Sequence, residues 1–332
     1  ALGNGVLIDA PDNTVWADYP NVGFNKKWIV VTVNMFLVSD NSWDSSYFYI
    51  FDKAALYQNL PTSHTVIFSG GDGSTHVPAL TYDFSAEELY FLQTWSPGSK
   101  VLRLYELAGD VGSEVITPLG FPEGPIPWTH TQGPADFAPQ RPGCSAACEP
   151  NCKIQTNDSR IQNVIYRDGS LWATQTVFLD SPTRSSVQWW EIDPLMGFPY
   201  RKQVGLIDDP NAGGFFYAFP SLGVNRLGDV MLGYSAFQDG EWARAHYSFR
   251  YRGDPAGTMR TDGLVQDGKA CYYKILTGTR NRWGDYSATV VDPSGEVKLW
   301  TVQEYAETPA GEDKWGTWWG MLDPTRAISI TD

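Results

Sequence analysis

Short apolar runs alternate with turn residues along the whole chain, and residues 281–305 show the pattern most clearly. An apolar run over 287–291 and a second over 297–305 flank the turn Asp292-Pro293-Ser294-Gly295. Proline at the second turn position presets φ, and Gly295 can adopt the positive φ that hairpin closure often requires. The Val, Thr, Trp and Tyr residues of both runs suit a buried, pleated strand. The segment therefore predicts a β-hairpin.

The same plan recurs four more times, at residues 18–34, 76–95, 161–178 and 218–235. The turn residues that set its register are Asn25, Asp83, Asp168, Asn225 and Asp292. Their intervals of 57 to 85 residues are too long for a simple hairpin repeat and suit a four-stranded blade.

Further apolar runs follow each hairpin. They lie at 46–51 and 65–69, 100–106 and 114–118, 186–192 and 202–207, and 245–251 and 270–276, with 314–322 as the last. The N-terminal run 5–9 can supply the missing outer strand of the last blade and leave no open edge. We therefore predict an all-β, five-bladed β-propeller that forms a single domain over 1–332, with six blades as the alternative. Only residues 52–59 suggest a short helix.

Charge argues against a nucleic-acid partner, and hydropathy argues against a transmembrane segment. The chain carries 38 acidic and 24 basic residues, for a formal net charge of −14, and no Lys/Arg cluster interrupts that balance. A phosphate backbone would be repelled, so nucleic acid is not expected as a partner. No apolar run of about 18 residues is present, so no transmembrane segment is expected. No signal-peptide pattern is visible at Ala1, although a cleaved one would leave none.

Four cysteines point to an oxidising compartment. Cys144, Cys148 and Cys152 crowd into one segment, and Cys271 lies far away. Zinc is the alternative, but the cluster contains no histidine. We expect disulfides, with Cys271 tied to the cluster, and hence a secreted, extracellular or periplasmic protein. The cluster ends a proline-rich excursion over 120–159, which we expect to form the wall or lid of a pocket.

The repeat also predicts which residues converge on the propeller axis. The position seven residues before each turn residue is occupied by Asp18, His76, Ile161, Ala218 and Asp285. Asp18 and Asp285 would lie on neighbouring blades once the ring closes. Three of the returning strands share a second polar position, at which Gln93, Gln175 and Gln303 align, and Glu304 follows the last of them.

Paired carboxylates suggest acid–base chemistry, because each shifts the pKa of the other. Asp18, Asp285 and Glu304 are the candidate catalytic residues, and His76 is a further acid–base candidate. Two alternatives remain at this stage. The same residues could satisfy hydrogen bonds between blades, or Asp18 and Asp285 could bind Ca²⁺ on the axis.

Aromatic residues outside the strand runs suggest sugar contacts. Sugar rings stack their C–H faces on aromatic platforms, while polar side chains bind their hydroxyl groups. The candidate substrate-binding residues are Arg160, Gln162, Tyr286, Trp95, Trp283 and Trp128. Exposed aromatic residues also make protein interfaces, which keeps that alternative open.

Several segments resemble a group of predicted exported bacterial propeller proteins without an assigned activity. The resemblance rests on RWGDYSATVVDP at 282–293, WTVQEY at 300–305 and KWGTWWG at 314–320, with further likeness at 161–176 and 218–235. At fold level the chain is similar to arabinanase and fructosidase propellers. Their three-carboxylate arrangement, with acids on the first three blades, is not reproduced here, because the second blade offers His76 and the third offers Ile161 or Gln162.

These observations predict a secreted carbohydrate-active protein that binds a glycan or polysaccharide at the axial mouth, with hydrolysis as a further step. The alternative is a non-catalytic module for protein interaction or self-assembly. The only cofactor that the pattern suggests is Ca²⁺.

Overall fold

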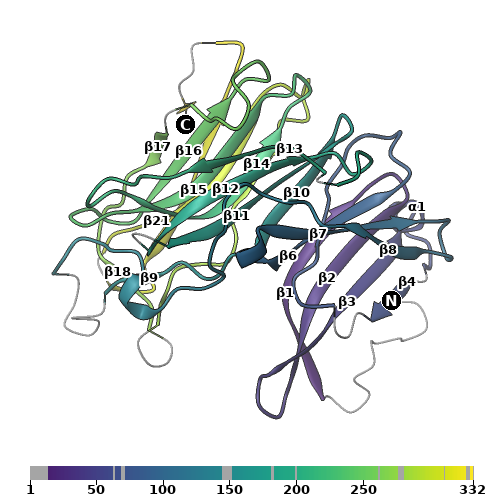
Figure 1. The fold of residues 1–332 in the computed structure, drawn as a ribbon, viewed down its shortest axis with the longest axis horizontal. Helices are drawn as coiled ribbons and strands as arrows, with labels where there is room; N and C mark the ends of the chain where they lie inside the picture. The colour runs from purple at the N-terminus through teal and green to yellow at the C-terminus, as the bar shows by residue number, and fades with distance from the viewer. Residues whose placement is uncertain are drawn as a thin grey trace. The chain divides into compact units, whose positions relative to one another are not determined.

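The computed structural model describes residues 14–62, 64–68, 72–143, 152–180, 183–198, 200–260, 262–275, 280–309, 311–326 and 330–331. This part of the chain is all-β, and it contains five four-stranded sheets (Figure 1). The all-β prediction is therefore confirmed. By contacts between Cα atoms the chain divides into two compact units, one mainly of residues 1–123 and the other mainly of 202–332, and we describe each by itself.

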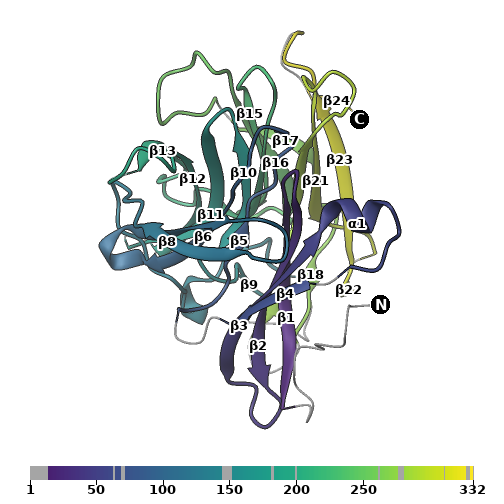
Figure 2. The same cartoon turned by 90° about the vertical axis from the view of Figure 1, so that its right-hand side faces the viewer.

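The first unit contains two complete sheets, and the strands of the first run through the lower part of Figure 2. The first consists of β1 (Val15–Phe24), β2 (Trp28–Leu37), β3 (Trp43–Asp52) and β4 (His64–Phe68). The second consists of β5 (Val77–Pro78), β6 (Leu89–Ser96), β7 (Val101–Ala108) and β8 (Val115–Gly120). Both are antiparallel, and a shared core that includes Trp28, Phe48 and Phe91 holds them face to face.

Parallel bridges join the leading strands of three successive repeats in this unit. Leu80 bridges Phe24 on one side and Ile165 on the other, and Leu80 N donates to Val164 O at 2.9 Å. Residues 163–171 belong to this unit. The leading strands therefore lie side by side and in the same direction, as blades around an axis require.

The second unit contains the last two complete sheets. One consists of β14 (Phe216–Val224), β15 (Val230–Phe237), β16 (Arg244–Arg250) and β17 (Gly263–Gln266). The other consists of β20 (Ala288–Val291), β21 (Leu299–Ala306), β23 (Trp315–Leu322) and β24 (Ile330–Thr331). They approach closely at Gly233, where an added Cβ would lie 2.1 Å from Thr301 Oγ1. Only glycine allows this contact between the sheets.

The remaining sheet consists of β10 (Ile161–Arg167), β11 (Ser170–Asp180), β12 (Thr183–Ile192) and β13 (Arg201–Ile207). Its turn ends, 163–171 and 192–201, group with the first unit and its other residues with the second. The short elements are α1 (Lys53–Tyr57), η2 (Pro97–Ser99), η3 (Pro134–Asp136), β9 (Ile154–Gln155), β18 (Tyr272–Tyr273), β19 (Asn281–Arg282) and β22 (Gly311–Glu312). Helix α1 confirms the predicted helix, with Asp52 Oδ1 accepting from Ala55 N as its N-cap. Within the described residues, none of the helices has the length and apolar character to span a bilayer.

Side-chain hydrogen bonds explain why asparagine occupies two of the predicted turn positions. Asn25 Oδ1 accepts from the backbone N–H groups of Lys27 and Trp28, and Asn225 Oδ1 does the same for Leu227 and Asp229. Their amide groups also donate to backbone carbonyls of the next sheet, including Val297 O at 2.9 Å. The same side chain thus closes a hairpin and joins two sheets.

One strand prediction was wrong, and a second concerns residues outside the described part of the chain. The outer strand after β16 is β17, whereas the predicted segment 270–276 contains β18, which pairs in parallel with β22. The outer strand of the last sheet is β24, from the C-terminal part of the chain, and the predicted run 5–9 lies outside the described residues. The sequence could not show which of two short apolar segments forms an outer strand, because such segments have the same pattern and differ only in the strands with which they pair.

The proline- and cysteine-rich excursion is held to the second unit by a small parallel ladder and a buried glutamine. β9 pairs with β19, and Gln140 Nε2 donates to Cys152 O and Tyr272 O at 2.6 and 2.7 Å. Neither described cysteine is a free thiol, and Cys152 and Cys271 are buried. Cys144 and Cys148 lie outside the described residues, so the pairing of the four cysteines stays a prediction.

Candidate functional site

A pocket of about 610 Å³ opens beside β20 and β21 in the second unit. Two short segments of the chain, 282–288 and 302–304, form most of its wall. The residues that line it are Lys274, Arg282, Trp283, Gly284, Asp285, Tyr286, Ser287, Ala288, Val302, Gln303, Glu304, Trp315 and Thr317. The pocket therefore brings together four of the predicted catalytic and binding residues, Asp285, Glu304, Tyr286 and Trp283, together with Gln303 of the recurring glutamine series.

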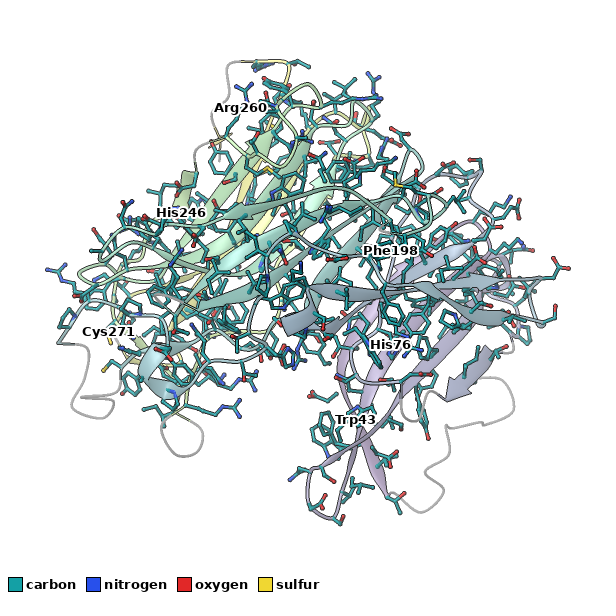
Figure 3. All side chains as sticks on the ribbon, viewed as in Figure 1. Trp43, His76, Phe198, His246, Arg260 and Cys271 are labelled. Carbon is teal, nitrogen blue, oxygen red and sulfur yellow. The ribbon has the colours of Figure 1, made fainter. Side chains whose placement is uncertain are left out.

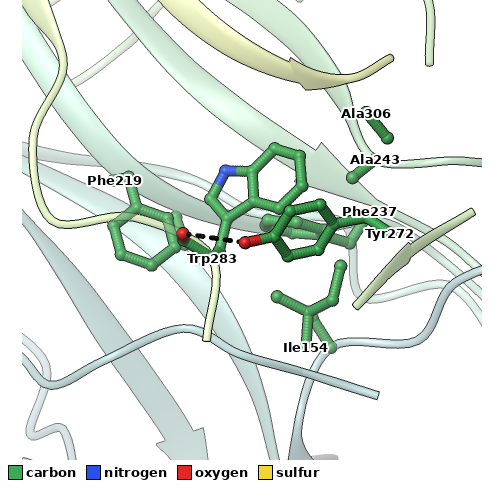
Figure 4. Close-up of a cluster of buried hydrophobic side chains, with 9 residues drawn as sticks. Ile154, Phe219, Phe237, Ala243, Tyr272, Trp283 and Ala306 are labelled. Carbon is green, nitrogen blue, oxygen red and sulfur yellow. Dashed lines mark hydrogen bonds between the residues drawn. The ribbon is translucent and has the colours of Figure 1, made fainter. Parts of the chain in front are cut away.

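A hydrophobic cluster beneath the pocket positions the segment that carries Asp285. Trp283 is 4% exposed and packs edge to face against Tyr272 and Phe237 (Figure 4). Its indole N–H donates to Ser235 Oγ at 3.0 Å. Ile154 of the excursion is part of the same cluster. The excursion thus packs behind the pocket wall, and none of its described residues lines this pocket. Its role as the wall or lid of a pocket stays a prediction.

Glu304 lies on β21 with its carboxyl group in a confined place. A Cβ atom at position 284 would lie 2.5 Å from Glu304 Oε2, so the glycine makes room for the carboxyl group. The other oxygen, Oε1, is buried and has no hydrogen-bond partner within the described residues. The pKa of Glu304 is raised to about 8, chiefly by burial and also by the carboxylates of Asp285 and Asp313, while Lys274 opposes the shift. The side chain is therefore mainly protonated at neutral pH.

Asp285 is held in a different environment. Arg282 Nη2 donates to its Oδ1 at 2.5 Å, and Asn157 Nδ2 reaches the same oxygen at 3.4 Å. The charge-assisted hydrogen bond from the guanidinium group fixes the position of the carboxylate. One pocket therefore contains a protonated glutamate and a salt-bridged aspartate, which is the arrangement that acid–base catalysis by two carboxyl groups requires.

Two aromatic rings lie at the pocket where solvent reaches them. Tyr286 and Trp315 line it, and each is 48% exposed. Trp283 also lines the pocket, but the expectation of an exposed indole was wrong there, because its ring fills the hydrophobic cluster beneath. Tyr286 and Trp315 are thus the aromatic surfaces available to a ligand.

The raised pKa of Glu304 predicts how stability depends on pH. The ordinary value is 4.5, so between about pH 4.5 and pH 8 the folded state retains a proton that the unfolded state releases. The free energy of unfolding should therefore fall as pH rises through this window, by on the order of 2 kcal/mol after allowance for screening by water. Chemical denaturation at several pH values will measure the fall. Glu304→Gln should flatten it, and an equally steep fall in that variant would assign it to other groups.

Gly284→Ala tests the confinement of the Glu304 carboxyl group. The new methyl group must displace the carboxyl group toward solvent, and the pKa of Glu304 should then fall toward its ordinary value. Carbon-13 NMR of the carboxyl group during a pH titration will show the change. Gly253→Ala is the matched control, because an added Cβ there meets nothing within 4 Å. An unchanged titration in Gly284→Ala would contradict the geometry described for this site.

Two of the predicted catalytic residues, Asp18 and His76, lie in the first unit. Asp18 is exposed at a bulge of β1. His76 is 1% exposed, lies between the rings of Phe48 and Tyr105, and has no hydrogen-bond partner for either ring nitrogen within the described residues (Figure 3). Burial lowers the pKa of His76 to about 4, so its imidazole is neutral at pH 7. This environment favours a packing role for His76.

The other predicted binding residues differ in exposure. Trp95 is 40% exposed, with the Arg103 guanidinium 4.6 Å from the centre of its ring. Arg160 is engaged by both carboxylate oxygens of Asp158, and Gln162 is 9% exposed. Trp128 is 3% exposed and donates to Ser159 Oγ, so the expectation of an exposed indole was wrong there as well. These four residues do not line the pocket described above.

Buried hydrogen bonds explain the recurring glutamines. Gln93 Nε2 donates to Asp72 O and Ser74 O, and Gln175 Nε2 donates to Gln188 Oε1. Gln303 Nε2 reaches Ser221 Oγ on the neighbouring sheet at 3.2 Å. These contacts agree with the structural interpretation of the glutamine series.

Nothing in the described part of the chain tests the Ca²⁺ hypothesis directly. In that part, no group of three or more His, Cys, Asp or Glu side chains is placed to hold a metal ion. Asp18 and Asp285 belong to different units, and Asp285 pairs with Arg282. Ca²⁺ binding therefore stays a hypothesis for experiment.

Sequence reasoning missed several residues of the pocket, among them Lys274, Arg282, Gly284 and Trp315. Gly284 and Trp315 lie within segments that were recognised, RWGDY and KWGTWWG. Strand alternation could have indicated an exposed Trp315, since every second residue of β23 from that position faces outward. Lys274 follows β18 and carried no such pattern.

Comparisons with known proteins give likeness to solved structures only. No family model and no curated protein matches the chain. An α-L-arabinanase of Penicillium chrysogenum is similar with a TM-score of 0.45, 8% identity and 94% of each chain covered. The GH32 β-fructofuranosidase BmSUC1 of Bombyx mori has a TM-score of 0.42 and 10% identity, covering 95% of this chain and 62% of that one. The catalytic domain of a Coprinopsis cinerea GH62 α-L-arabinofuranosidase has a TM-score of 0.40 and 11% identity, covering 97% and 94%. Values this low transfer no residue's role to this chain.

Proposed function

We propose that the protein binds a glycan in the pocket beside β21 and hydrolyses it with Glu304 and Asp285. The observation that carries the proposal is the pair itself: a confined, protonated glutamate and a salt-bridged aspartate in one pocket of about 610 Å³. Two partly exposed aromatic rings, Tyr286 and Trp315, provide surfaces on which the C–H face of a sugar can stack.

In this mechanism Glu304 is the general acid. Its proton passes to the glycosidic oxygen as the bond from that oxygen to the anomeric carbon breaks, so the leaving sugar departs as an alcohol. The Asp285 carboxylate stabilises the positive charge that develops on the sugar ring. Water then adds its oxygen to the anomeric carbon as the new hydroxyl group, and its other proton passes to the Glu304 carboxylate, which restores the acid. Arg282 and Asn157 hold Asp285 in place for that role.

We further propose that the five sheets are the blades of one propeller and that the protein is exported. The parallel bridges through Leu80 support a shared axis for the leading strands of three repeats. The absence of free thiols among the described residues agrees with an oxidising compartment. Peptide mapping without reduction should recover Cys271 linked to the 144–152 cluster, and free thiols at these positions would argue against export.

Thermal unfolding across a panel of polysaccharides tests the proposed function, because a ligand that prefers the folded state raises the midpoint. Parallel samples with Ca²⁺ and with chelator test the metal hypothesis. We expect one class of glycan to raise the midpoint, and its products should then be assayed. A rise with Ca²⁺ alone would favour metal binding at Asp18 or Asp285, and no rise with any glycan would count against the proposal.

The second candidate function is a protein-interaction module. The observation that favours it is a set of exposed apolar side chains in the first unit: Phe84 and Leu195 are each 78% exposed, and Phe198 is 71% exposed (Figure 3). Such side chains commonly mark contact surfaces. Light scattering of the wild type and of Phe198→Ser would detect self-association through this surface, and a monomer at all concentrations would exclude that form of assembly.

A further inference from the structure

Two basic side chains face each other at the pocket. Ile275 and Asn281 form an antiparallel bridge, and Arg282 N donates to Lys274 O at 3.0 Å. Lys274 and Arg282 are therefore direct cross-strand neighbours, and both side chains line the pocket. Cross-strand proximity and a shared cavity place the two positive charges close to the same ligand position.

This arrangement has an electrostatic cost in the unliganded protein. Like charges directly opposite each other destabilise a strand pair. Each cation is partly compensated: Lys274 Nζ lies 2.9 Å from Asp313 Oδ1, and Arg282 Nη2 lies 2.5 Å from Asp285 Oδ1. An anionic ligand between the two would complete the compensation.

Both cations retain capacity for a ligand. The side chains of Lys274 and Arg282 are 33% and 31% exposed, so solvent and ligand can reach them. Within the described residues, Nε and Nη1 of Arg282 make no hydrogen bond, and its side chain is engaged only through Nη2. A planar guanidinium with free N–H groups is suited to a planar carboxylate.

The negative net charge of the chain contrasts with the two cations, Lys274 and Arg282, at the pocket. The protein has a net charge of −14, so its surface as a whole repels anions. A pocket with two cations attracts them locally, since clefts concentrate the field of the charges that line them. Asp285 and Asp313 each offset part of this field through their ion pairs, whereas Glu304 is mainly protonated and does not.

We infer that the glycan unit bound in this pocket carries a carboxylate, that is, a uronic acid residue, and that Lys274 and Arg282 bind that carboxylate. The inference rests on the proposed glycan binding and adds the class of sugar. Glu304 and Asp285 would still act at the glycosidic bond, because the uronate carboxylate and the anomeric carbon lie on different sides of the ring oxygen.

The test compares uronic acid oligosaccharides with their carboxyl-reduced counterparts. Oligomers of galacturonic, glucuronic and mannuronic acid, each beside its reduced form, are titrated against the intact protein by thermal unfolding and calorimetry. At least one uronide should bind about tenfold or more tightly than its reduced form, as the loss of a charge-assisted contact implies. A sulfated oligosaccharide serves as a further arm, because it is anionic but lacks the planar carboxylate.

Each other outcome overturns the inference in a distinguishable way. Equal or tighter binding of reduced sugars would overturn it and leave the proposed glycan binding in place. Binding of the sulfated oligosaccharide alone would overturn the assignment to a carboxylate. No binding of any sugar would overturn both the inference and the proposed function.

Variants identify the residues responsible. Lys274→Met should weaken uronide binding about tenfold and leave binding of the reduced sugar nearly unchanged. Arg282→Lys should weaken it too, because the charge remains but the planar fork is lost. Lys269→Met is the matched control, since Lys269 pairs with Glu307 and does not line the pocket. Circular dichroism confirms folding of each variant, and wild-type uronide binding by folded Lys274→Met would overturn the inference.

Discussion

Replacing Glu304 with glutamine should lower the rate of glycan hydrolysis by about a hundredfold to ten-thousandfold, the usual contribution of a general acid. The amide has almost the same shape as the protonated carboxyl group but cannot transfer a proton to the leaving oxygen. It also carries no charge, so it suits the buried position of Oε1. Glycan binding, measured by calorimetry, should therefore persist while hydrolysis is lost.

Glu307→Gln provides the control for this experiment. Glu307 lies three residues further along, pairs with Lys269 and does not line the pocket. Its replacement should leave hydrolysis unchanged. If Glu304→Gln kept the full rate on the glycan that binds, another residue would have to supply the proton, and the assignment of Glu304 as the acid would be withdrawn.

Trp283→Ala should lower the free energy of unfolding by about 3–5 kcal/mol, the usual cost of removing a buried tryptophan. The ring is 4% exposed, its centre lies 4.7 Å from that of Tyr272 and 5.6 Å from that of Phe237, and its N–H donates to Ser235. Truncation leaves a cavity beneath the pocket and removes the donor to Ser235 Oγ. Chemical denaturation measures the loss, and ligand binding should fail with it because the segment 282–286 loses its support.

Trp315→Ala is the comparison that separates packing from ligand contact. Trp315 is 48% exposed, so its removal should change stability by about 0.5 kcal/mol or less, as for ordinary surface positions. Glycan affinity should nevertheless fall, because the stacking surface is gone. Equal loss of stability in the two variants would contradict the distinction between a buried support and an exposed platform.

The periodic pattern was enough to predict most strands, because it depends on interactions that are local in sequence. Asn25 and Asn225 close their turns with their own side chains, and Asp52 caps its own helix. The alternation around Asp292 likewise identified both strands of the last hairpin. Local chemistry of this kind requires no knowledge of distant neighbours.

The candidate pocket was predictable in part. Asp285 and Tyr286 follow from the repeat position, and Glu304 follows from the end of the returning strand. The sequence could not predict which of the candidate catalytic residues would lie at the pocket and which would lie elsewhere. The repeat identifies equivalent positions in each predicted blade, but it does not specify which side chains surround them. His76 occupies the place of an axial acid, yet its imidazole is enclosed by Phe48 and Tyr105.

The sequence by itself thus determined the all-β class, the register of the hairpins and the residue types at the strand ends, since these follow from side-chain alternation and turn chemistry. The tertiary structure alone decided that Glu304 is buried against Gly284, that Trp283 supports the pocket from beneath, and that Lys274 lies across from Arg282. The tertiary structure also decided that β17 and β24 are the outer strands of their sheets. Each of these depends on contacts between segments far apart in the chain, and burial and pairing arise only when those segments meet.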